Sequence, residues 1–305
     1  MINTFEKAFS ELFKDNENIV LIVPDDDKLY SSSRRYVNVG IAECNAIGMA
    51  AGLASCGKIP FVKGGGSFLA HRSNEFIRDD VSMQNRNVKI IATGAGIAIN
   101  ALGNTQHMTE DMSSLRAMPN MVIVTPATPT EVALAVPKIA EINKPVYMRI
   151  GRHEGIDVYD HNNLTFEIGK GQMIKEGWDV TIITTGTILS DVLQVIPRLE
   201  ENNIHVEVIN MHTIKPIDED MIIQSGEKTG KILTIEEHSV IGGLKSAVAE
   251  VLADRGSAVK LYGMGLQDCF AKGYGTYKEI KETNGLGQED IYETVKNIVN
   301  KVEEF

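Results

Sequence analysis

Short apolar runs alternate along the chain with stretches of helical length. In the first half, five runs of four to six residues are rich in β-branched side chains and bounded by glycine, proline or asparagine: Ile19–Pro24, Ile59–Val62, Val88–Thr93, Met121–Pro126 and Val146–Ile150. Such runs are typical of strands buried on both faces of a parallel sheet. Helices are expected over Ala42–Cys56, which Gly57 would end, and over Thr130–Ile142. The alternation predicts a doubly wound α/β domain over residues 1–152.

A polar, aperiodic segment at residues 153–169 interrupts this alternation and is expected to link two domains. The strand and helix pattern then restarts. Strands are expected over Asp179–Thr185, His205–Met211 and Lys231–Glu236, and helices over Leu189–Asn202, Leu244–Ala253 and Glu289–Val302. Residues 170–305 are therefore predicted to form a second, smaller α/β domain.

Composition and charge exclude several classes of function. The 305 residues include 30 Lys and Arg against 41 Asp and Glu, a formal net charge of −11. An acidic chain repels nucleic-acid phosphates and anionic lipid, so binding to nucleic acid or to a membrane surface is not expected. No apolar run approaches the ~18 residues of a membrane span. The three cysteines, Cys44, Cys56 and Cys269, show no metal-binding spacing, which favours a reduced, cytoplasmic compartment and no metal site in this chain.

Two glycine-rich turns follow predicted strands, but neither has the spacing of a nucleotide-binding loop. Gly64–Gly66 lacks both the Gly-x-Gly-x-x-Gly pattern and a following Lys-Ser/Thr pair, and Gly94–Gly96 fails because Ile99 stands at the third glycine position. The chain also lacks the His-Glu-x-x-His, Cys-x-x-Cys and Gly-x-Ser-x-Gly motifs. Zinc hydrolase, redox-pair and serine hydrolase chemistry therefore have no support.

Glu43 is the most informative single residue. It lies where a strand turns into a helix, in the string Val-Gly-Ile-Ala-Glu-Cys-Asn-Ala at residues 39–46. An acidic residue in the first turn often only complements the helix dipole. Here the neighbours are small or apolar, and burial of a carboxyl suits it to proton transfer.

The string around Glu43, VNVGIAECNAIGMAAGLASCGKIPFV, resembles the pyrimidine-binding domain of transketolases, which carries a Gly-Ile-Ala-Glu-Gln-Asn core. The resemblance continues through GNTQHMTEDMSSLRAMPN at 103–120 and PVYMRIGR at 145–152. In the second domain it includes VINMHTIKPID at 208–218 and IEEHSVIGGLKSAVAEVL at 235–252. It covers nearly the whole chain, in order.

The family's diphosphate-binding domain, with its Gly-Asp-Gly motif for the metal and the cofactor tail, has no counterpart in this sequence. The resemblance therefore implies the C-terminal subunit of a split transketolase. It implies an N-terminal partner subunit that holds the diphosphate of thiamine diphosphate and Mg²⁺, and a homodimer of this chain within a heterotetramer.

The resemblance also implies roles for individual residues. In the family, the glutamate that matches Glu43 hydrogen-bonds the pyrimidine ring of the cofactor and takes part in its activation. The positions expected to contact the cofactor are Asp25, Glu43, Phe68 and His71. The positions expected to contact substrate are Gly94, Gln106, His107 and Arg149. Arg149 matches an arginine that binds the substrate phosphate, so a sugar with an anionic tail is expected.

Several positions depart from the family pattern. Gly65 replaces a pocket aromatic, Gly94 and Gln106 replace histidines, and Leu102 replaces an aspartate that reads substrate hydroxyls. The two glycines are expected to enlarge the pocket. Loss of hydrogen-bonding partners lowers discrimination for the groups they read, so a non-standard sugar is predicted. The β subunit of a 2-oxo-acid dehydrogenase or a pyruvate-using synthase is an alternative, and a non-catalytic stabilising subunit is another.

Overall fold

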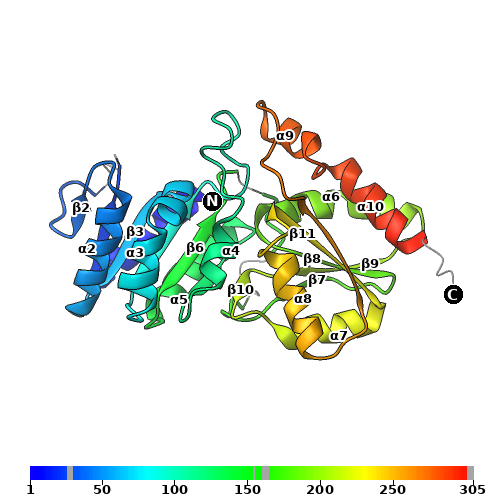
Figure 1. Ribbon diagram of the computed structural model, residues 1–305, viewed down its shortest axis with the longest axis horizontal. Coiled ribbons are helices and arrows are strands. Elements are labelled where there is room, and N and C mark those ends of the chain that lie inside the picture. Colours follow the sequence, from blue (N-terminus) through cyan, green and yellow to red (C-terminus); the bar gives the residue numbers. More distant parts are fainter. Residues whose placement is uncertain (26–29, 154, 160–164, 301–305) are drawn as a thin grey trace.

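The computed structural model describes residues 1–25, 30–153, 155–159 and 165–300, and shows two α/β units side by side (Figure 1). The first sheet has the order β10-β5-β6-β4-β3-β1-β2. Its strands are β1 (Ile19–Val23), β2 (Tyr36–Asn38), β3 (Ile59–Gly65), β4 (Lys89–Thr93), β5 (Val122–Val124), β6 (Val146–Ile150) and β10 (Thr213–Lys215). Its strands run parallel except β10, which comes from the second half of the chain and pairs antiparallel with β5.

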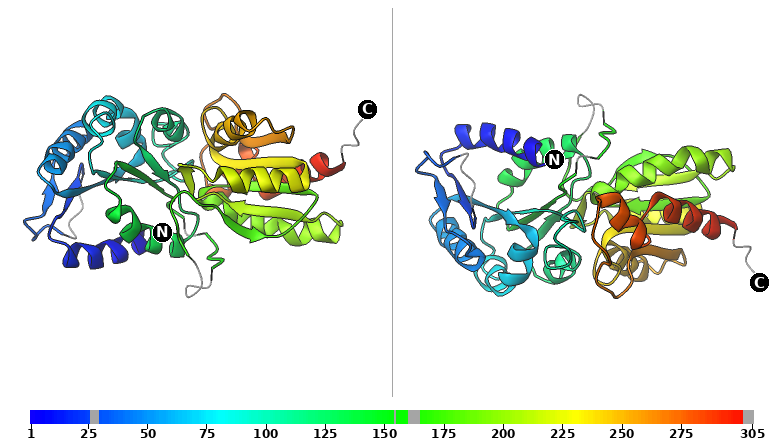
Figure 2. Two further views of the ribbon diagram at one scale, coloured as in Figure 1. Left: turned by 90° about the horizontal axis from the view of Figure 1, so that it is seen from below. Right: turned by 90° about the horizontal axis from the view of Figure 1, so that it is seen from above.

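Helices cover both faces of this sheet (Figure 2). They are α1 (Ile2–Asp15), α2 (Glu43–Ser55), α3 (Asn74–Phe76), α4 (Asp111–Arg116) and α5 (Pro129–Glu141), with π-helical turns at η1 (Phe68–Arg72) and η2 (Ile77–Ser82). Side chains of β1 alternate between the faces: Ile19 and Leu21 pack in the cluster of α1 and α5, and Val20 and Ile22 pack in that of α2. The doubly wound architecture predicted for the first domain is confirmed.

The second sheet has the order β12-β11-β8-β9-β7, parallel except for β7. Its strands are β7 (Gln172–Lys175), β8 (Val180–Thr184), β9 (Val206–Asn210), β11 (Lys231–Ser239) and β12 (Lys260–Leu266). Its helices are η3 (Gly186–Ile188), α6 (Leu189–Glu201), α7 (Glu219–Thr229), α8 (Leu244–Asp254), α9 (Tyr277–Thr283) and α10 (Gln288–Asn300). The boundaries predicted at residues 152 and 170 fall between β6 and β7. Residues 154 and 160–164 of the expected linker, and 301–305 at the end of the expected terminal helix and second domain, lie outside the described residues.

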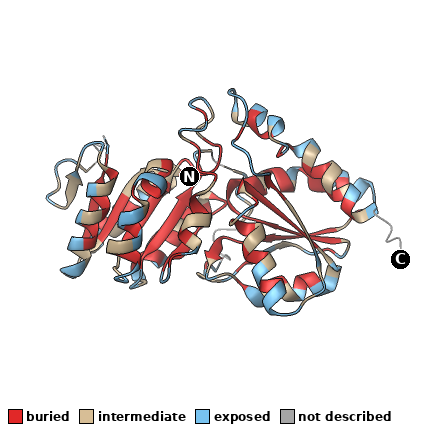
Figure 3. Cartoon of the chain, viewed as in Figure 1, coloured by how far each residue is buried: buried red, intermediate tan, exposed pale blue. Residues whose placement is uncertain are grey.

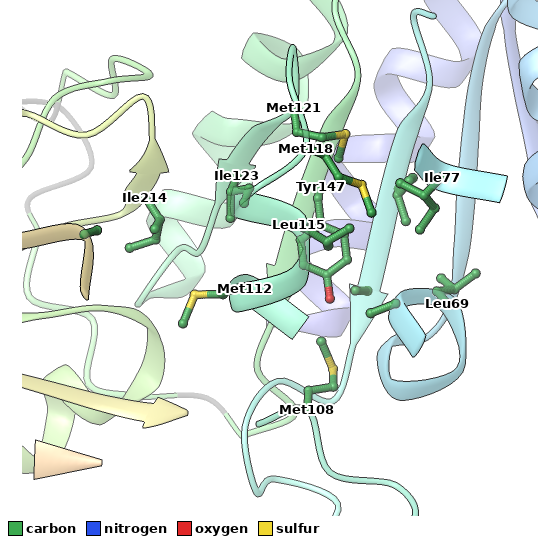
Figure 4. Packing of buried hydrophobic residues seen from close by; sticks show 14 of the residues in the cluster. Leu69, Ile77, Met108, Met112, Leu115, Met118, Met121, Ile123, Tyr147 and Ile214 are labelled. Carbon is green, nitrogen blue, oxygen red and sulfur yellow. The ribbon is translucent and has the colours of Figure 1, made fainter. Parts of the chain in front are cut away.

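Strands β1, β4, β5, β6, β8, β9 and β11 are buried along most of their length, whereas the edge strands β2 and β7 have no buried residue (Figure 3). On the α4 side of the first sheet, methionines fill the space between helix and strands. Met108, Met112 and Met118 pack in one cluster with Leu115 and Tyr147 (Figure 4). Flexible thioether side chains suit such an irregular gap, and this packing fixes the start of α4 beside the site described next.

Candidate functional site

A cavity of about 450 Å³ lies beyond the carboxyl end of β3. In doubly wound sheets, ligands characteristically bind in crevices at this end of the strands. The segment after β3 contributes Ser67, Phe68, His71 and Arg72, the loop before α4 contributes Asn104, Thr105, His107 and Glu110, and the second domain contributes Phe270. Three predicted site residues, Phe68, His71 and His107, are thus brought together.

Glu43 is the first residue of α2 and is 4% exposed. Its Oε2 accepts a hydrogen bond from Nη1 of Arg72 at 2.6 Å. The same guanidinium lies over the ring of Phe68, with its Cζ 4.8 Å from the ring centroid. Arg72 therefore joins the predicted catalytic carboxylate to the predicted pocket aromatic, and it does so from the wall of the cavity.

Two imidazoles and one carboxylate also line the cavity. Nε2 of His71 lies 3.7 Å from Oε2 of Glu110. His107 is buried, and its Nδ1 lies 3.3 Å from the side-chain oxygen of Asn104. Burial lowers the pKa of His107 although the charge of Glu110 opposes the shift, so this ring is neutral near pH 7. Nε2 of His107 and Oγ of Ser67 are buried polar atoms without a hydrogen-bond partner among the described residues.

The glycines near the site serve packing. A Cβ atom added to Gly65 would lie 3.3 Å from the ring of Phe68. Gly94 has φ +90°, and a Cβ there would lie 2.6 Å from Cδ1 of Ile99. Ile99 therefore occupies the space beside Gly94, and Gly94 does not line the cavity. The absence of a side chain at position 94 does not enlarge the pocket, contrary to the expectation from sequence.

Arg149 is placed differently from its expected role. It is 2% exposed, its Nε donates to Oδ2 of Asp111 at 2.9 Å, and its Nη2 donates to the carbonyl oxygens of Met108 and Glu237. Glu237 belongs to β11, so the guanidinium joins the two domains. These contacts point the charged group into the domain interface, and Arg149 is not part of the cavity wall.

Two further predicted residues, Asp25 and Gln106, do not line the cavity. Asp25 follows β1 at the surface, and its carbonyl oxygen accepts a hydrogen bond from the side chain of Asn38 at 3.1 Å. Gln106 is half-buried, and its backbone N–H donates to Gly103. Sequence reasoning missed Arg72 and Phe270 entirely. An arginine in a helix and a phenylalanine in a glycine-rich loop carry no periodic signal, because only the folded chain brings them to one cavity.

Comparison with known proteins identifies the fold. Residues 1–155 match the transketolase pyrimidine binding domain, and residues 169–291 match the transketolase C-terminal domain. The chain belongs to the transketolase family. The predicted resemblance is thereby confirmed, as is the predicted pairing of a pyrimidine-binding domain with a transketolase C-terminal domain.

Similar transketolase proteins include single subunits of larger enzymes. The chain is 36% identical to the 6-deoxy-6-sulfo-D-fructose transketolase subunit SqwH of Clostridium sp., over 88% of this chain and 82% of that protein. It is 34% identical to one of the apulose-4-phosphate transketolase subunits of Phocaeicola vulgatus, over 98% of this chain and 97% of that protein. A solved split-gene transketolase, described as an inactive β4 tetramer, shares 37% identity with a TM-score of 0.87 and covers 97% of each chain.

Neither a metal cluster nor a membrane-spanning helix is found in the part of this chain that the structure describes. Among residues 1–25, 30–153, 155–159 and 165–300, no group of three or more His, Cys, Asp or Glu side chains could hold a metal ion. No helix in the same described ranges combines the length and apolar character needed to cross a membrane.

Proposed function

We propose that this chain is the pyrimidine-binding subunit of a two-subunit, thiamine-diphosphate-dependent transketolase. The complex would transfer a two-carbon ketol unit from a ketose donor to an aldose acceptor. The observation that carries this proposal is the buried carboxylate of Glu43 at the start of α2, linked through Arg72 to the cavity that contains Phe68.

The residues present fit the pyrimidine part of the cofactor. A buried carboxylate suits a hydrogen bond to a ring nitrogen, and the Phe68 ring offers an aromatic face. The buried, unpartnered polar atoms of Ser67 and His107 are available to a ligand. A cavity of about 450 Å³ is of the size that small ligands occupy.

Thiamine diphosphate, when bound, supplies an electron sink for cleavage of the carbon–carbon bond beside a ketose carbonyl. This chain would provide the groups that orient and protonate. Glu43 would share a proton with the pyrimidine nitrogen and fix the orientation of the ring. Phe68 would pack against the ring, and His107, kept neutral because burial lowers its pKa, would offer an uncharged imidazole to the ligand.

We place the diphosphate and Mg²⁺ on an N-terminal partner subunit, in a heterotetramer that contains a homodimer of this chain. The two family domains that match this chain are the pyrimidine-binding and C-terminal domains, and neither is the diphosphate-binding domain. The similar β4 tetramer is described as inactive. Ile41, two residues before Glu43, is 75% exposed, and Leu102 is 61% exposed. Large apolar side chains exposed beside a site favour a surface that a partner covers.

The donor is proposed to be a ketose other than the common sugar phosphates. Two subunits similar to this chain are named for 6-deoxy-6-sulfo-D-fructose and for apulose 4-phosphate. An anionic tail would need an anchor other than Arg149, because that guanidinium is committed to Asp111 and to β11. Arg72 and His71 line the cavity, and the partner subunit can supply further cations.

The test is a donor screen of this chain co-purified with its N-terminal subunit, with glycolaldehyde as acceptor. The donors are xylulose 5-phosphate, fructose 6-phosphate, 6-deoxy-6-sulfofructose, apulose 4-phosphate and pyruvate. We expect cofactor-dependent cleavage of a ketose and poor use of the first two donors. Cleavage of pyruvate alone would instead favour the synthase alternative. Binding of the partner without cleavage of any donor would favour a stabilising role.

A further inference from the structure

The segment at residues 267–276, between β12 and α9, reaches from the second domain to the cavity of the first. In Figure 1 it rises on the same side of the molecule as the loop before α4. Leu266, Ala271 and Ile280 form a buried cluster with Ile97 of the first domain. The side chain of Asn100 donates a hydrogen bond to the carbonyl oxygen of Gly275. Apolar and polar contacts thus hold this segment against the first domain.

A second attachment lies at Gly103. This residue has φ +71°, and a Cβ atom added to it would lie 2.5 Å from Cε1 of Tyr274. The Tyr274 ring therefore packs directly on the Gly103 backbone, and a side chain at position 103 would be strained by the positive φ and would have to move this ring. Gly103 immediately precedes Asn104 and Thr105 of the cavity wall, so the position of the segment and that of the wall are coupled.

Between these attachments, Phe270 projects its ring into the site. It is 70% exposed, yet it lines the same cavity as Phe68 and His107. It also lines a second cavity of about 260 Å³, together with Glu110, Ser239, Asp268 and Cys269. Phe270 and Glu110 belong to both cavities, so the outer cavity adjoins the one that contains the cofactor-facing residues.

We propose that residues 267–276 form a substrate-recognition wall, with Phe270 packed against the carbon skeleton of the sugar beyond its reacting carbonyl. The carboxylates of Glu110 and Asp268 would accept hydrogen bonds from sugar hydroxyls in the outer cavity. The second domain thereby sets the preference for substrate length and hydroxylation. This inference rests on the proposed transferase function.

Acceptor length tests the wall in the two-subunit complex. With a donor that the wild-type complex cleaves, Phe270→Ala should raise KM for D-ribose by about tenfold, because the ring loses apolar contact with the longer sugar. KM for glycolaldehyde, which is too short to extend beyond the ring, should stay within about twofold of wild type. Phe76→Ala is the matched control, since Phe76 is a partly exposed aromatic outside both cavities.

A fluorescence titration gives a readout that does not depend on turnover. The chain has a single tryptophan, Trp178, so Trp178→Phe combined with Phe270→Trp places the only indole of this chain on the wall. D-ribose should change its emission in the complex more than glycolaldehyde does. Control complexes that carry Trp178→Phe alone should show no such change beyond the partner subunit's own signal.

Three results would overturn the inference. They are equal effects of Phe270→Ala on both acceptors, an unchanged KM for D-ribose in the assembled variant complex, and an indole that does not respond to D-ribose. Failure of the proposed function looks different, because the wild-type complex would then bind no thiamine diphosphate and cleave no donor. In that case the fluorescence titration still decides whether the wall binds a sugar.

Discussion

Removal of the Arg72 guanidinium should lower the free energy of unfolding and, at the same time, raise the affinity for thiamine diphosphate. The Arg72 guanidinium contacts both groups that the pyrimidine ring is proposed to contact: it donates a hydrogen bond to the carboxylate of Glu43 and lies over the ring of Phe68. The ring must therefore displace it. Arg72→Met keeps a long side chain over Phe68 but removes the charge and its hydrogen-bond donors.

The size of both effects follows from how far the side chains of Glu43 and Arg72 are exposed. The Glu43 side chain is 5% exposed and that of Arg72 is 48% exposed. A hydrogen bond to a charged group contributes about 1.5–3 kcal/mol when desolvated and an exposed ion pair about 0.2–1 kcal/mol, so this pair should contribute about 1 kcal/mol. The isolated variant should lose about that free energy of unfolding. The assembled variant should bind thiamine diphosphate about fivefold more tightly, because that contact no longer has to be broken.

Urea unfolding of the isolated chain and calorimetric titration of the two-subunit complex with thiamine diphosphate and Mg²⁺ measure the two effects. Arg78→Met is the matched control, since Arg78 pairs with its neighbour Asp79 on an exposed part of the same helical region. It should change neither affinity nor stability by more than about 0.5 kcal/mol. Weaker or unchanged cofactor binding by Arg72→Met would show that the guanidinium stays in place and does not have to be displaced.

The remaining predictions concern three buried groups. Glu43→Gln should lower turnover of the complex by about 10²–10⁴-fold while size-exclusion chromatography shows normal assembly, and retention of more than about a tenth of the rate would exclude its proton-transfer role. Arg149→Ala should lower the free energy of unfolding by about 3–5 kcal/mol, since it removes the buried cation that pairs with Asp111. An unchanged unfolding midpoint with a raised donor KM would restore the substrate-anchor role. Burial raises the pKa of Glu131 to about 7, so the folded state holds this proton more tightly than the unfolded state does. Relative to Glu131→Gln, the wild-type chain should therefore lose about 1.4 kcal/mol of stability per pH unit from about pH 4.5 to 7, and parallel pH profiles would contradict this shift.

The architecture could be predicted because buried parallel strands are read directly from continuous apolar runs. Elements without such runs were missed. Residues 2–15 form α1, whose Phe5, Phe9 and Phe13 recur every four residues and bury one helical face, although the surrounding charges mask that stripe. β10 consists of only three residues, and its pairing with β5 depends on contact between the two domains.

The site was only partly predictable, for a related physical reason. Glu43 stands out because it lies where a strand turns into a helix among small and apolar neighbours, and Phe68 is assigned through the family resemblance alone. Arg149 also matches a family position, but its partners Asp111 and Glu237 come from distant segments, one of them in the other domain. Whether Arg149 anchors a substrate or holds the structure together depends on those partners, and no local sequence pattern reveals them.

Arg149 also explains how a site on the first domain comes to depend on the second. Its guanidinium binds the carbonyl oxygen of Met108 and the carboxylate of Asp111, and so holds both ends of the segment that carries Glu110. The same group binds the backbone of Glu237 in β11, which fixes that segment relative to the second domain. Residues 267–276 follow β12, the neighbour of β11 in the same sheet. The cavity wall from the first domain and the Phe270 wall from the second are therefore both positioned by the buried guanidinium of Arg149. A change at this domain interface would move the two walls relative to each other and alter the width of the substrate site, while the position of Glu43 stayed the same.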